Sequence, residues 1–424
     1  MTIPLPNMIE VTQTFPASPS INYHSVLAEQ FRTQGLNSRL SPGMRIAVGV
    51  GSRGITNLKE IVRAALDVLI AEGTRPFLVP AMGSHGGATP EGQAKVLAEY
   101  GLTADSLGVP IEAAMDVEKI GTALDGRDLY FSVPALRADA LMVINRIKPH
   151  TDFRGTLGSG IQKMLVIGFG KQTGAASTHR AAAHFGYEPT IREFARVILQ
   201  NVRMLCGIAI LEDQHHMTSE LRVLRPDTIA TEEPPLLEKA RALMPRLPLD
   251  EIDLLIVDRI GKEISGSGMD TNIIGRDITG YSTSLQNSTE LKPHISRIFV
   301  RDLTEATKGN GIGIGLADFT TDRAVKALDL HSIYVNATTS LGLNTAKIPI
   351  HFPTDRQVIE HALSTLASPH TEKLRIVRIK DTLNLQRMLV SESCAAMLDN
   401  VPGISQVGKS GEMQFDQADN LQPF

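Results

Sequence analysis

The residues best suited to chemistry lie in one glycine-rich stretch in the middle of the chain, residues 145–180. This stretch contains His150, Lys163 and His179. Glycine lets the main chain come close to a ligand, and imidazole suits metal binding and proton transfer near neutral pH. The stretch is therefore a candidate ligand site; the alternative is a long surface loop whose polar side chains face water.

Three apolar runs, each typical of a buried strand, end next to a polar side chain that can act on a small molecule. The pairs are Arg45–Val50 followed by Arg53, residues 77–81 followed by His85, and residues 140–144 followed by His150. In an open parallel sheet, ligands bind at the carboxyl ends of the strands. We therefore expect these three side chains at one edge of a sheet.

A glycine motif follows the first of these strands. Residues Gly49, Gly51 and Gly54 match the spacing G-x-G-x-x-G between a strand and a helix, which is the context of a dinucleotide fingerprint. The next strand ends without an Asp or Glu to hold a ribose. One interpretation is NAD binding; the other is a tight turn that presents Arg53 as a clamp for a carboxylate or phosphate.

Helical patterns separate the strands. Residues 57–72 have an apolar stripe of helical period, with Asn57 and Glu60 predicted to form a capping box. Thr89 and Pro90 predict the start of a second helix, which runs to about Tyr100. Further strands are predicted at 111–115, 207–211 and 221–224. Strands alternating with helices predict an α/β domain with a largely parallel sheet and Rossmann-like alternation.

At 424 residues the chain is too long for a single core. We predict an N-terminal catalytic, cofactor-binding domain over 1–225, a proline-rich linker over 226–250, and a C-terminal α/β domain over 251–424 that closes over the site. The second pattern starts at Ile252. It includes strands near 297–300, 332–335 and 374–379 and a helix over 354–367. The polar tail after Gly403 is expected to be loosely ordered.

Composition excludes several classes of protein. The net charge of −4 implies no basic face, so we expect no nucleic-acid partner. The two cysteines, Cys206 and Cys394, suggest neither a disulfide framework nor a CxxC metal site. The N-terminus lacks the pattern of a signal peptide and no run of 18 apolar residues occurs. We therefore expect a cytoplasmic protein that does not bind a membrane.

Taken together, five short motifs in this order resemble the nickel-dependent lactate racemase family of 2-hydroxyacid racemases. The resemblance covers residues 44 to about 225, and its specificity lies in the ordered set rather than in any one motif. The motifs are SR at Arg53, GSHGGAT at His85, PH at His150, SGIQK at Lys163, and the downstream His179.

The resemblance implies an isomerase that racemises or epimerises a small 2-hydroxy acid by hydride transfer. The implied cofactor is a nickel pincer nucleotide, pyridinium-3-thioamide-5-thiocarboxylic acid mononucleotide with Ni, supplied by cofactor-maturation proteins. Lys163 would carry it covalently and His179 would bind its metal. His85 and His150 would act as acid and base on opposite faces of the substrate. Arg53 would bind the substrate carboxylate.

Two departures from the family bear on the substrate. The spacing from His150 to Lys163 is longer than the family's, and the C-terminal half keeps a D-x-N element at Asp270 without the Gln and Lys that follow it in the family. Lys262 and Arg276 are the candidates to replace that pair. Two other functions stay open: an NAD-dependent dehydrogenase, and a non-catalytic protein that binds a hydroxy acid.

Overall fold

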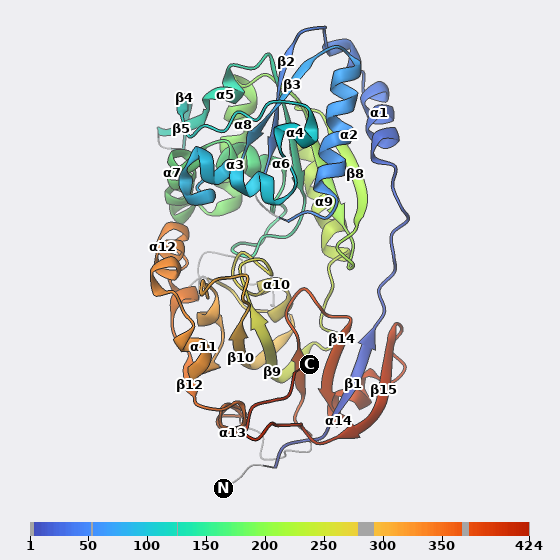
Figure 1. Cartoon of the computed structure of the whole chain (residues 1–424), viewed down its shortest axis with the longest axis vertical. Helices are drawn as coiled ribbons and strands as arrows, with labels where there is room; N and C mark the ends of the chain where they lie inside the picture. The colour runs from blue at the N-terminus through green and yellow to red at the C-terminus, as the bar shows by residue number, and fades with distance from the viewer. Residues whose placement is uncertain (1–3, 52–53, 125, 279–291, 367–372, 424) are drawn as a thin grey trace. The chain divides into compact units, whose positions relative to one another are not determined.

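The computed structural model describes residues 4–51, 54–124, 126–278, 292–366 and 373–423. The chain forms two compact units (Figure 1). The inner unit comprises Ala17–Met244, and the terminal unit combines Met1–Pro16 with Pro245–Phe424. Both contain a sheet with parallel strands and flanking helices, so the predicted α/β class is confirmed.

The inner unit is built on a five-stranded sheet in the order β3-β2-β6-β7-β8. Its first four strands run parallel, and the last runs antiparallel to its neighbour. Val50 at the end of β2 pairs with Pro80 on one side and with Ile144 on the other, so three strands end at the same edge. The strands are β2 (Arg45–Val50), β3 (Arg75–Pro80), β6 (Ala140–Arg146), β7 (Met204–Glu212) and β8 (Thr218–Leu224).

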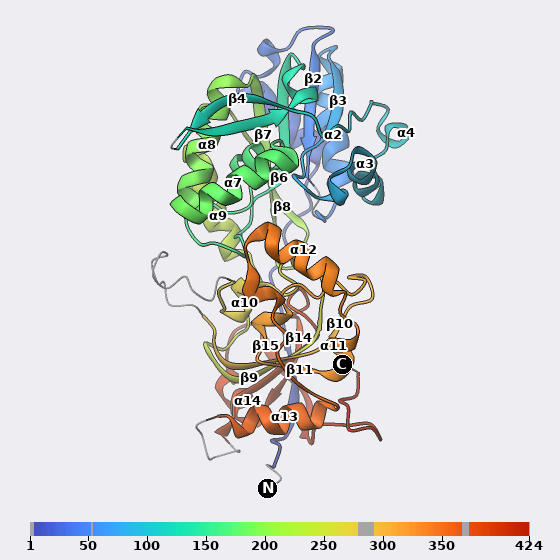
Figure 2. The same cartoon turned by 90° about the vertical axis from the view of Figure 1, so that its left-hand side faces the viewer.

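Helices cover both faces of this sheet, which is why its strands are continuous apolar runs. Along β2, Ile46 and Val48 pack on one side with helices α1 (Tyr23–Thr33) and α2 (Leu58–Ala71). Ala47 packs on the other side, in a core to which three further helices contribute (Figure 2). These are α7 (Lys171–Phe185), α8 (Tyr187–Asn201) and α9 (Ile229–Ala242), and a β-hairpin of β4 (Val117–Ala123) and β5 (Arg127–Ser132) joins them.

The predicted helix starts had different outcomes. Thr89 caps α3 (Pro90–Glu99), since its hydroxyl accepts a hydrogen bond from the main-chain N–H of Gly92 at 3.0 Å. The capping box at Asn57 was wrong. Asn57 has a left-handed conformation with φ of 62° and makes no side-chain cap bond, whereas a capping residue uses extended backbone.

The terminal unit contains an eight-stranded sheet in the order β12-β11-β10-β9-β13-β14-β1-β15. The first five strands are parallel and the last three are antiparallel. Helix α13 (Asp355–Ser364) packs on this sheet through Val358 and Leu363. The strands are β1 (Met8–Gln13), β9 (Glu251–Ile260), β10 (His294–Leu303), β11 (Phe319–Thr321), β12 (Ile350–Phe352), β13 (Ile376–Ile379), β14 (Arg387–Ser391) and β15 (Ile404–Gly411).

Local patterns misled the prediction where pairing between distant segments decides the structure. The tail after Gly403 forms β15, which pairs with β1 at the opposite end of the chain. Residues 332–335 lie in helix α12 (Leu330–Ser340) rather than in a strand. Residues 111–115 contribute an isolated bridge from Ile111 to Leu78. The segment predicted as a linker, 226–250, contains helix α9 in its middle, and the linker assignment stays a prediction. Shorter helices are α4 (Ala104–Leu107), α5 (Val133–Leu136), α10 (Thr271–Ile274), α11 (Asp322–Lys326) and α14 (Glu392–Leu398).

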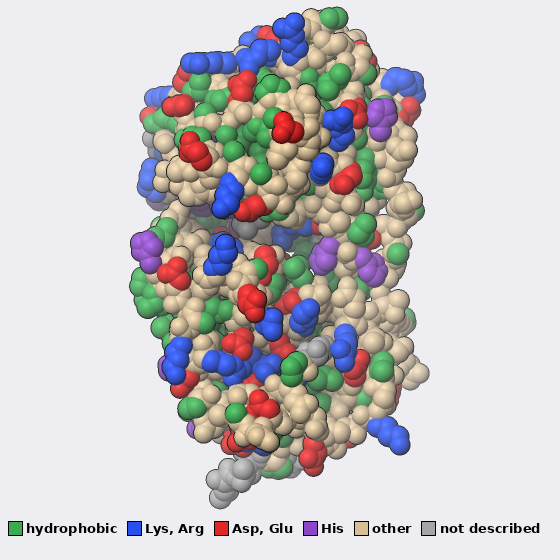
Figure 3. All heavy atoms as spheres, in the orientation of Figure 1, with side chains coloured by type: hydrophobic (Ala, Val, Ile, Leu, Met, Phe, Trp, Pro, Cys, Tyr) green, Lys and Arg blue, Asp and Glu red, His purple; other side chains and the backbone are tan. Residues whose placement is uncertain are grey.

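The surface carries charge of both signs. On the face shown in Figure 3, basic and acidic side chains are interspersed, in keeping with the net charge of −4. None of the helices formed by the described residues has the length and apolar character needed to span a bilayer.

Candidate active site

The candidate site lies where the order of the inner sheet reverses. From β2 the chain passes to β3 on one side and later returns to β6 on the other. Open α/β sheets bind ligands in the crevice outside such a switch point. His85 follows β3 and His150 follows β6, so both lie beyond the same edge, as the sequence predicted. Arg53 lies outside the described residues.

Lys163 belongs to a short segment that the inner unit holds from two sides. We call residues 158–163 the lysine segment. On one side, Lys148 and Ser159 exchange two main-chain hydrogen bonds of 3.0 and 2.8 Å. The Asn145 amide also donates to the Gly160 carbonyl at 2.7 Å. On the other side, the Glu233 carboxylate of α9 accepts the N–H of Gln162 at 3.1 Å.

The lysine segment leads into unusual helical structure. The short helix α6 (Ile161–Lys163) continues directly into a π-helix, Met164–Gly168. π-helical turns are rare and are frequent at functional sites. Lys163 therefore lies at the junction of two helical geometries.

His150 contacts Lys163 directly, through its Nε2 atom and the lysine Nζ. The side chain of His150 is only 12% exposed. Its Nδ1 atom accepts a hydrogen bond from the main-chain N–H of Asp152 at 3.0 Å, and the Asp152 carboxylate lies 3.9 Å from the same atom. Asp152 therefore controls which ring nitrogen of His150 carries the proton.

A stack of rings connects His150 to His179. His150 stacks on Phe153 with ring centroids 4.5 Å apart, and Phe153 stacks on Tyr187 at 5.0 Å. His179 meets the edge of Tyr187 at 6.0 Å, and its Nδ1 atom lies 3.2 Å from the tyrosine hydroxyl. The four rings and Lys163 form one cluster, which we call the ring cluster. His179 lies in the middle of α7.

The electrostatics of the ring cluster favour a neutral imidazole at His179. Burial lowers the pKa of His179, the positive charge of Lys163 lowers it further, and the negative charge of Asp152 acts in the opposite direction. Burial also raises the pKa of Tyr187, with Asp152 adding to the effect. Neutral imidazole is the form that binds a metal, and a hydrogen bond at the other ring nitrogen is the usual support for such a ligand.

His85 lies on a separate, exposed loop after β3, and the structure does not place it in the ring cluster. A buried network holds this loop. The Gln93 amide donates to the carbonyls of Gly83 at 2.9 Å and His85 at 3.3 Å. Lys171, at the start of α7, donates to Gln93 at 2.8 Å and to the Pro80 carbonyl at 2.5 Å. Burial lowers the pKa of Lys171 to about 8.

The glycines of the G-x-G-x-x-G motif make room for protein rather than for a nucleotide. A Cβ at Gly49 would lie 2.1 Å from the ring of Phe169, and one at Gly51 would lie 2.9 Å from the methyl group of Met164. Met164 follows Lys163 directly and begins the π-helix, and Phe169 follows the last residue of that helix. This packing argues against a pyrophosphate site at these two glycines. It explains the glycines by the space that they leave for the side chains of Met164 and Phe169.

Several residues of the site had no visible signal in the sequence. Tyr187, Glu233 and Gln93 each have at least one contact with a residue distant in the chain, and neither motif nor spacing marks them. In the terminal unit, the two candidates to replace the family's Gln and Lys pair both have partners. Lys262 donates to Asn336 at 2.6 Å, and Arg276 forms two hydrogen bonds to the Asp318 carboxylate, the shorter at 2.6 Å.

The protein by itself offers no complete metal site in the described part of the chain, since no three His, Cys, Asp or Glu residues there could hold an ion together. A metal at His179 would need further ligands from a cofactor.

Comparison with known proteins shows distant likeness only. No family model matches the chain, and no curated protein matches it. Two solved structures are similar to it over 82% of its length. The lactate racemase apoprotein from Thermoanaerobacterium thermosaccharolyticum is 14% identical, with a TM-score of 0.48 and 87% of that chain covered. A protein from Thermotoga maritima is 13% identical, with a TM-score of 0.47 and 84% of that chain covered.

Proposed function

We propose that the chain is a racemase or epimerase of a small 2-hydroxy acid that works with a nickel pincer nucleotide attached to Lys163. The observation that carries the proposal is the ring cluster. It joins Lys163, His150 and His179, the residues to which the family resemblance assigns attachment, proton transfer and metal binding, although 29 positions separate the outermost two.

The residues present fit such a cofactor. Lys163 offers an amine for covalent attachment beside a glycine-rich segment, where the main chain can approach a flat ring closely. His179 offers a neutral imidazole whose Nδ1 is engaged by Tyr187, which leaves Nε2 for the metal. When bound, the cofactor supplies an electron-poor centre that accepts and returns hydride.

The protein's own task is then to move protons and hold the substrate. Removal of hydride from the 2-carbon requires a base for the hydroxyl proton, and each enantiomer needs its own base. His150 and His85 are the candidates. For His150 to accept a proton at Nε2, its Nδ1 must carry one, so the Asp152 carboxylate must replace the Asp152 N–H as the partner of Nδ1. Arg53 would hold the carboxylate during inversion.

The test begins with the attachment site. The chain is co-expressed with cofactor-maturation proteins, and its intact mass, nickel content and racemisation of a panel of 2-hydroxy acids are measured. We expect a covalent adduct on wild-type protein and on Lys95→Ala, a control at an exposed lysine of α3, but not on Lys163→Ala. An adduct that survives Lys163→Ala refutes the attachment. Tight NAD binding without an adduct would support a dehydrogenase, and hydroxy-acid binding without turnover a non-catalytic protein.

A further inference from the structure

Glu233 is a buried carboxylate that points at the main chain of the lysine segment. It is 2% exposed and lies on α9, 70 positions after Lys163 in the chain. Its Oε2 atom accepts the Gln162 N–H at 3.1 Å and the Gln162 side-chain amide at 3.2 Å, and the Ile161 N–H is a further donor to the carboxylate. The carboxylate thus satisfies the first main-chain donors of α6, which have no partner within the helix.

The lysine segment is shaped to receive this carboxylate. A Cβ at Gly160 would lie 1.8 Å from Oε1 of Glu233, so only glycine lets the two elements approach this closely. A Cβ at Gly158 would lie 2.3 Å from the Lys148 carbonyl, which is the hydrogen-bonded contact on the opposite side of the segment. Both glycines of the SGIQK region are therefore explained by the two anchors that hold it.

A buried carboxylate at this position lowers the free energy of unfolding, because burying a charge without an opposite charge is unfavourable. In the described part of the chain Glu233 forms no ion pair, and amide groups are its donors. When it is ionised, the carboxylate accepts stronger hydrogen bonds from N–H groups than a neutral acceptor does. The hydrogen bonds to Glu233 restrain the main chain immediately before Lys163.

We infer that Glu233 is a positioning residue for Lys163. By fixing the N–H groups of Ile161 and Gln162, it directs the Lys163 side chain toward His150 and the ring cluster. The role in attachment rests on the proposed function, whereas the restraint on the main chain does not, so the two can be tested separately.

The restraint is measured by hydrogen exchange on protein expressed without maturation proteins. In Glu233→Ala, we expect the Ile161 and Gln162 amides to exchange about tenfold faster or more, since a buried partner is lost, while β7 exchanges as in the wild type. Glu233→Gln should show a smaller increase confined to the same amides, because one carboxamide oxygen replaces two carboxylate oxygens. Glu232→Gln, on the same helix, serves as the control.

The consequence for Lys163 is measured in protein co-expressed with the maturation proteins. Adduct formation should fall by about tenfold or more in Glu233→Ala and recover partly in Glu233→Gln. Two results would overturn the inference. One is exchange of the Ile161 and Gln162 amides at the rate of the Glu232→Gln control in both variants; the other is an equal rise in exchange throughout the inner unit. A wild-type protein without any adduct refutes the proposed function instead and leaves the exchange result intact.

Discussion

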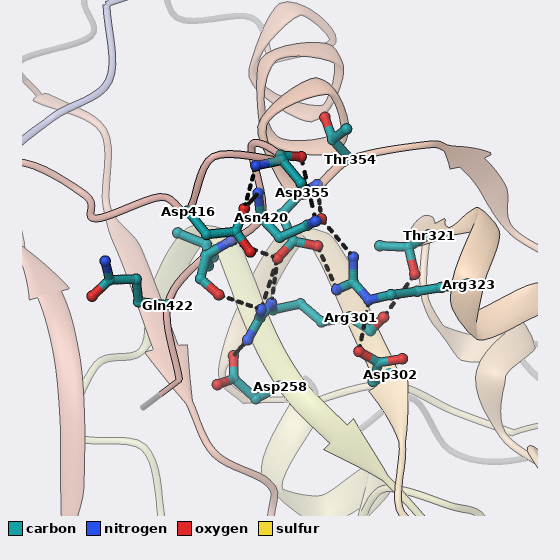
Figure 4. Close-up of polar contacts among 12 residues, drawn as sticks. Asp258, Arg301, Asp302, Thr321, Arg323, Thr354, Asp355, Asp416, Asn420 and Gln422 are labelled. Carbon is teal, nitrogen blue, oxygen red and sulfur yellow. Dashed lines mark hydrogen bonds and ion pairs between the residues drawn. The ribbon is translucent and has the colours of Figure 1, made fainter.

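One group of buried charges in each unit is held in a different way. In the inner unit, Glu233 and Lys171 form no ion pair among the described residues. The hydrogen bonds described above join them to amide and carbonyl groups of α6, α3 and β3, next to the segments that carry site residues. In the terminal unit, four buried charges, Arg301, Arg378, Asp258 and Asp355, pair with one another. Arg301 bonds to Asp355 at 2.8 Å and lies 3.0 Å from Asp258 (Figure 4). Arg378 makes two bonds of 2.8 Å to Asp258.

The network of buried charges in the terminal unit also forms hydrogen bonds to residues near the C-terminus. Arg301 donates to the Leu421 carbonyl at 2.8 Å, Arg378 to the Gln422 carbonyl at 2.7 Å, and Arg323 to the Asn420 side chain at 2.8 Å. Charges that neutralise one another and hold backbone in place have a structural role. A buried charge without an opposite charge costs free energy of folding, and for Glu233 we attribute that cost to its positioning of the lysine segment. The comparison predicts effects on rate in the inner unit, together with a pH-dependent stability at Glu233, and effects on stability in the terminal unit.

The largest effect is expected at the two proposed bases. His150→Ala and His85→Ala should each lower racemisation by about 10²–10⁴-fold, the usual contribution of a positioned acid or base. The free energy of unfolding should change little for the exposed His85. His184→Ala, an exposed histidine of α7, is the control. Single-turnover absorbance of the cofactor with separate enantiomers is the measurement, and each variant should keep activity toward a different enantiomer. The same preference in both would eliminate the two-base mechanism.

In the terminal unit, Asp355→Ala should lower the free energy of unfolding by about 3–5 kcal/mol, because removal of one partner leaves buried charges uncompensated. Asp355 is fully buried and pairs with both Arg301 and Arg323. Asp419→Ala removes an exposed pair with Arg356 from the same end of the chain and should cost about 1 kcal/mol or less. Denaturant unfolding measures both. Equal costs would show that the network does not act as a buried unit.

Glu233 should impose a pH dependence that the paired charges do not. Burial raises its pKa from 4.5 to about 7, so the folded state binds more protons than the unfolded state between these values. The contribution of Glu233 to the free energy of unfolding is fully present below pH 4.5. It falls by about 3 kcal/mol as the pH rises through 7. As the pH rises from 4.5 to 7, the free energy of unfolding of Glu233→Gln should therefore rise relative to that of the wild type by about 3 kcal/mol, as measured by denaturant unfolding. Parallel curves would contradict the buried carboxylate.

The sequence predicted those parts of the fold and the site that depend on local pattern. β2 and the start of β6 follow from apolar runs, and the edge location of His85 and His150 follows from parallel strands. The strand β15 was missed because its order comes from pairing with β1, nearly the whole chain away. Helix α12 was missed because the run Ile333–Val335 suits a strand equally well by composition.

The support of the site was invisible for the same reason. Glu233 meets Gln162 across 71 positions, and Gln93 meets Lys171 across 78. No spacing rule spans such distances. The motif at Gly49 was ambiguous because a glycine that admits a pyrophosphate and one that admits a phenyl ring look identical in a sequence. Only the contact with Phe169 separates the two.

The smallest effect is expected at Tyr187, and it sharpens the assignment of His179. Tyr187→Phe removes the hydroxyl at His179 Nδ1 but keeps the ring that stacks on Phe153. Loss of such a supporting hydrogen bond typically weakens metal binding by about 10–100-fold. We therefore expect reduced nickel retention under chelator challenge, smaller than the loss in His179→Ala, with the Lys163 adduct still present.

Tyr130→Phe is the matched control, since that hydroxyl contacts Asp128 at 3.4 Å, outside the ring cluster. Nickel retention unchanged by Tyr187→Phe but lost in His179→Ala would mean that the tyrosine only packs. If Tyr187→Phe, His179→Ala and His150→Ala lose nickel equally, the assignment of His179 as the metal ligand is wrong. The roles within the ring cluster would then have to be reassigned.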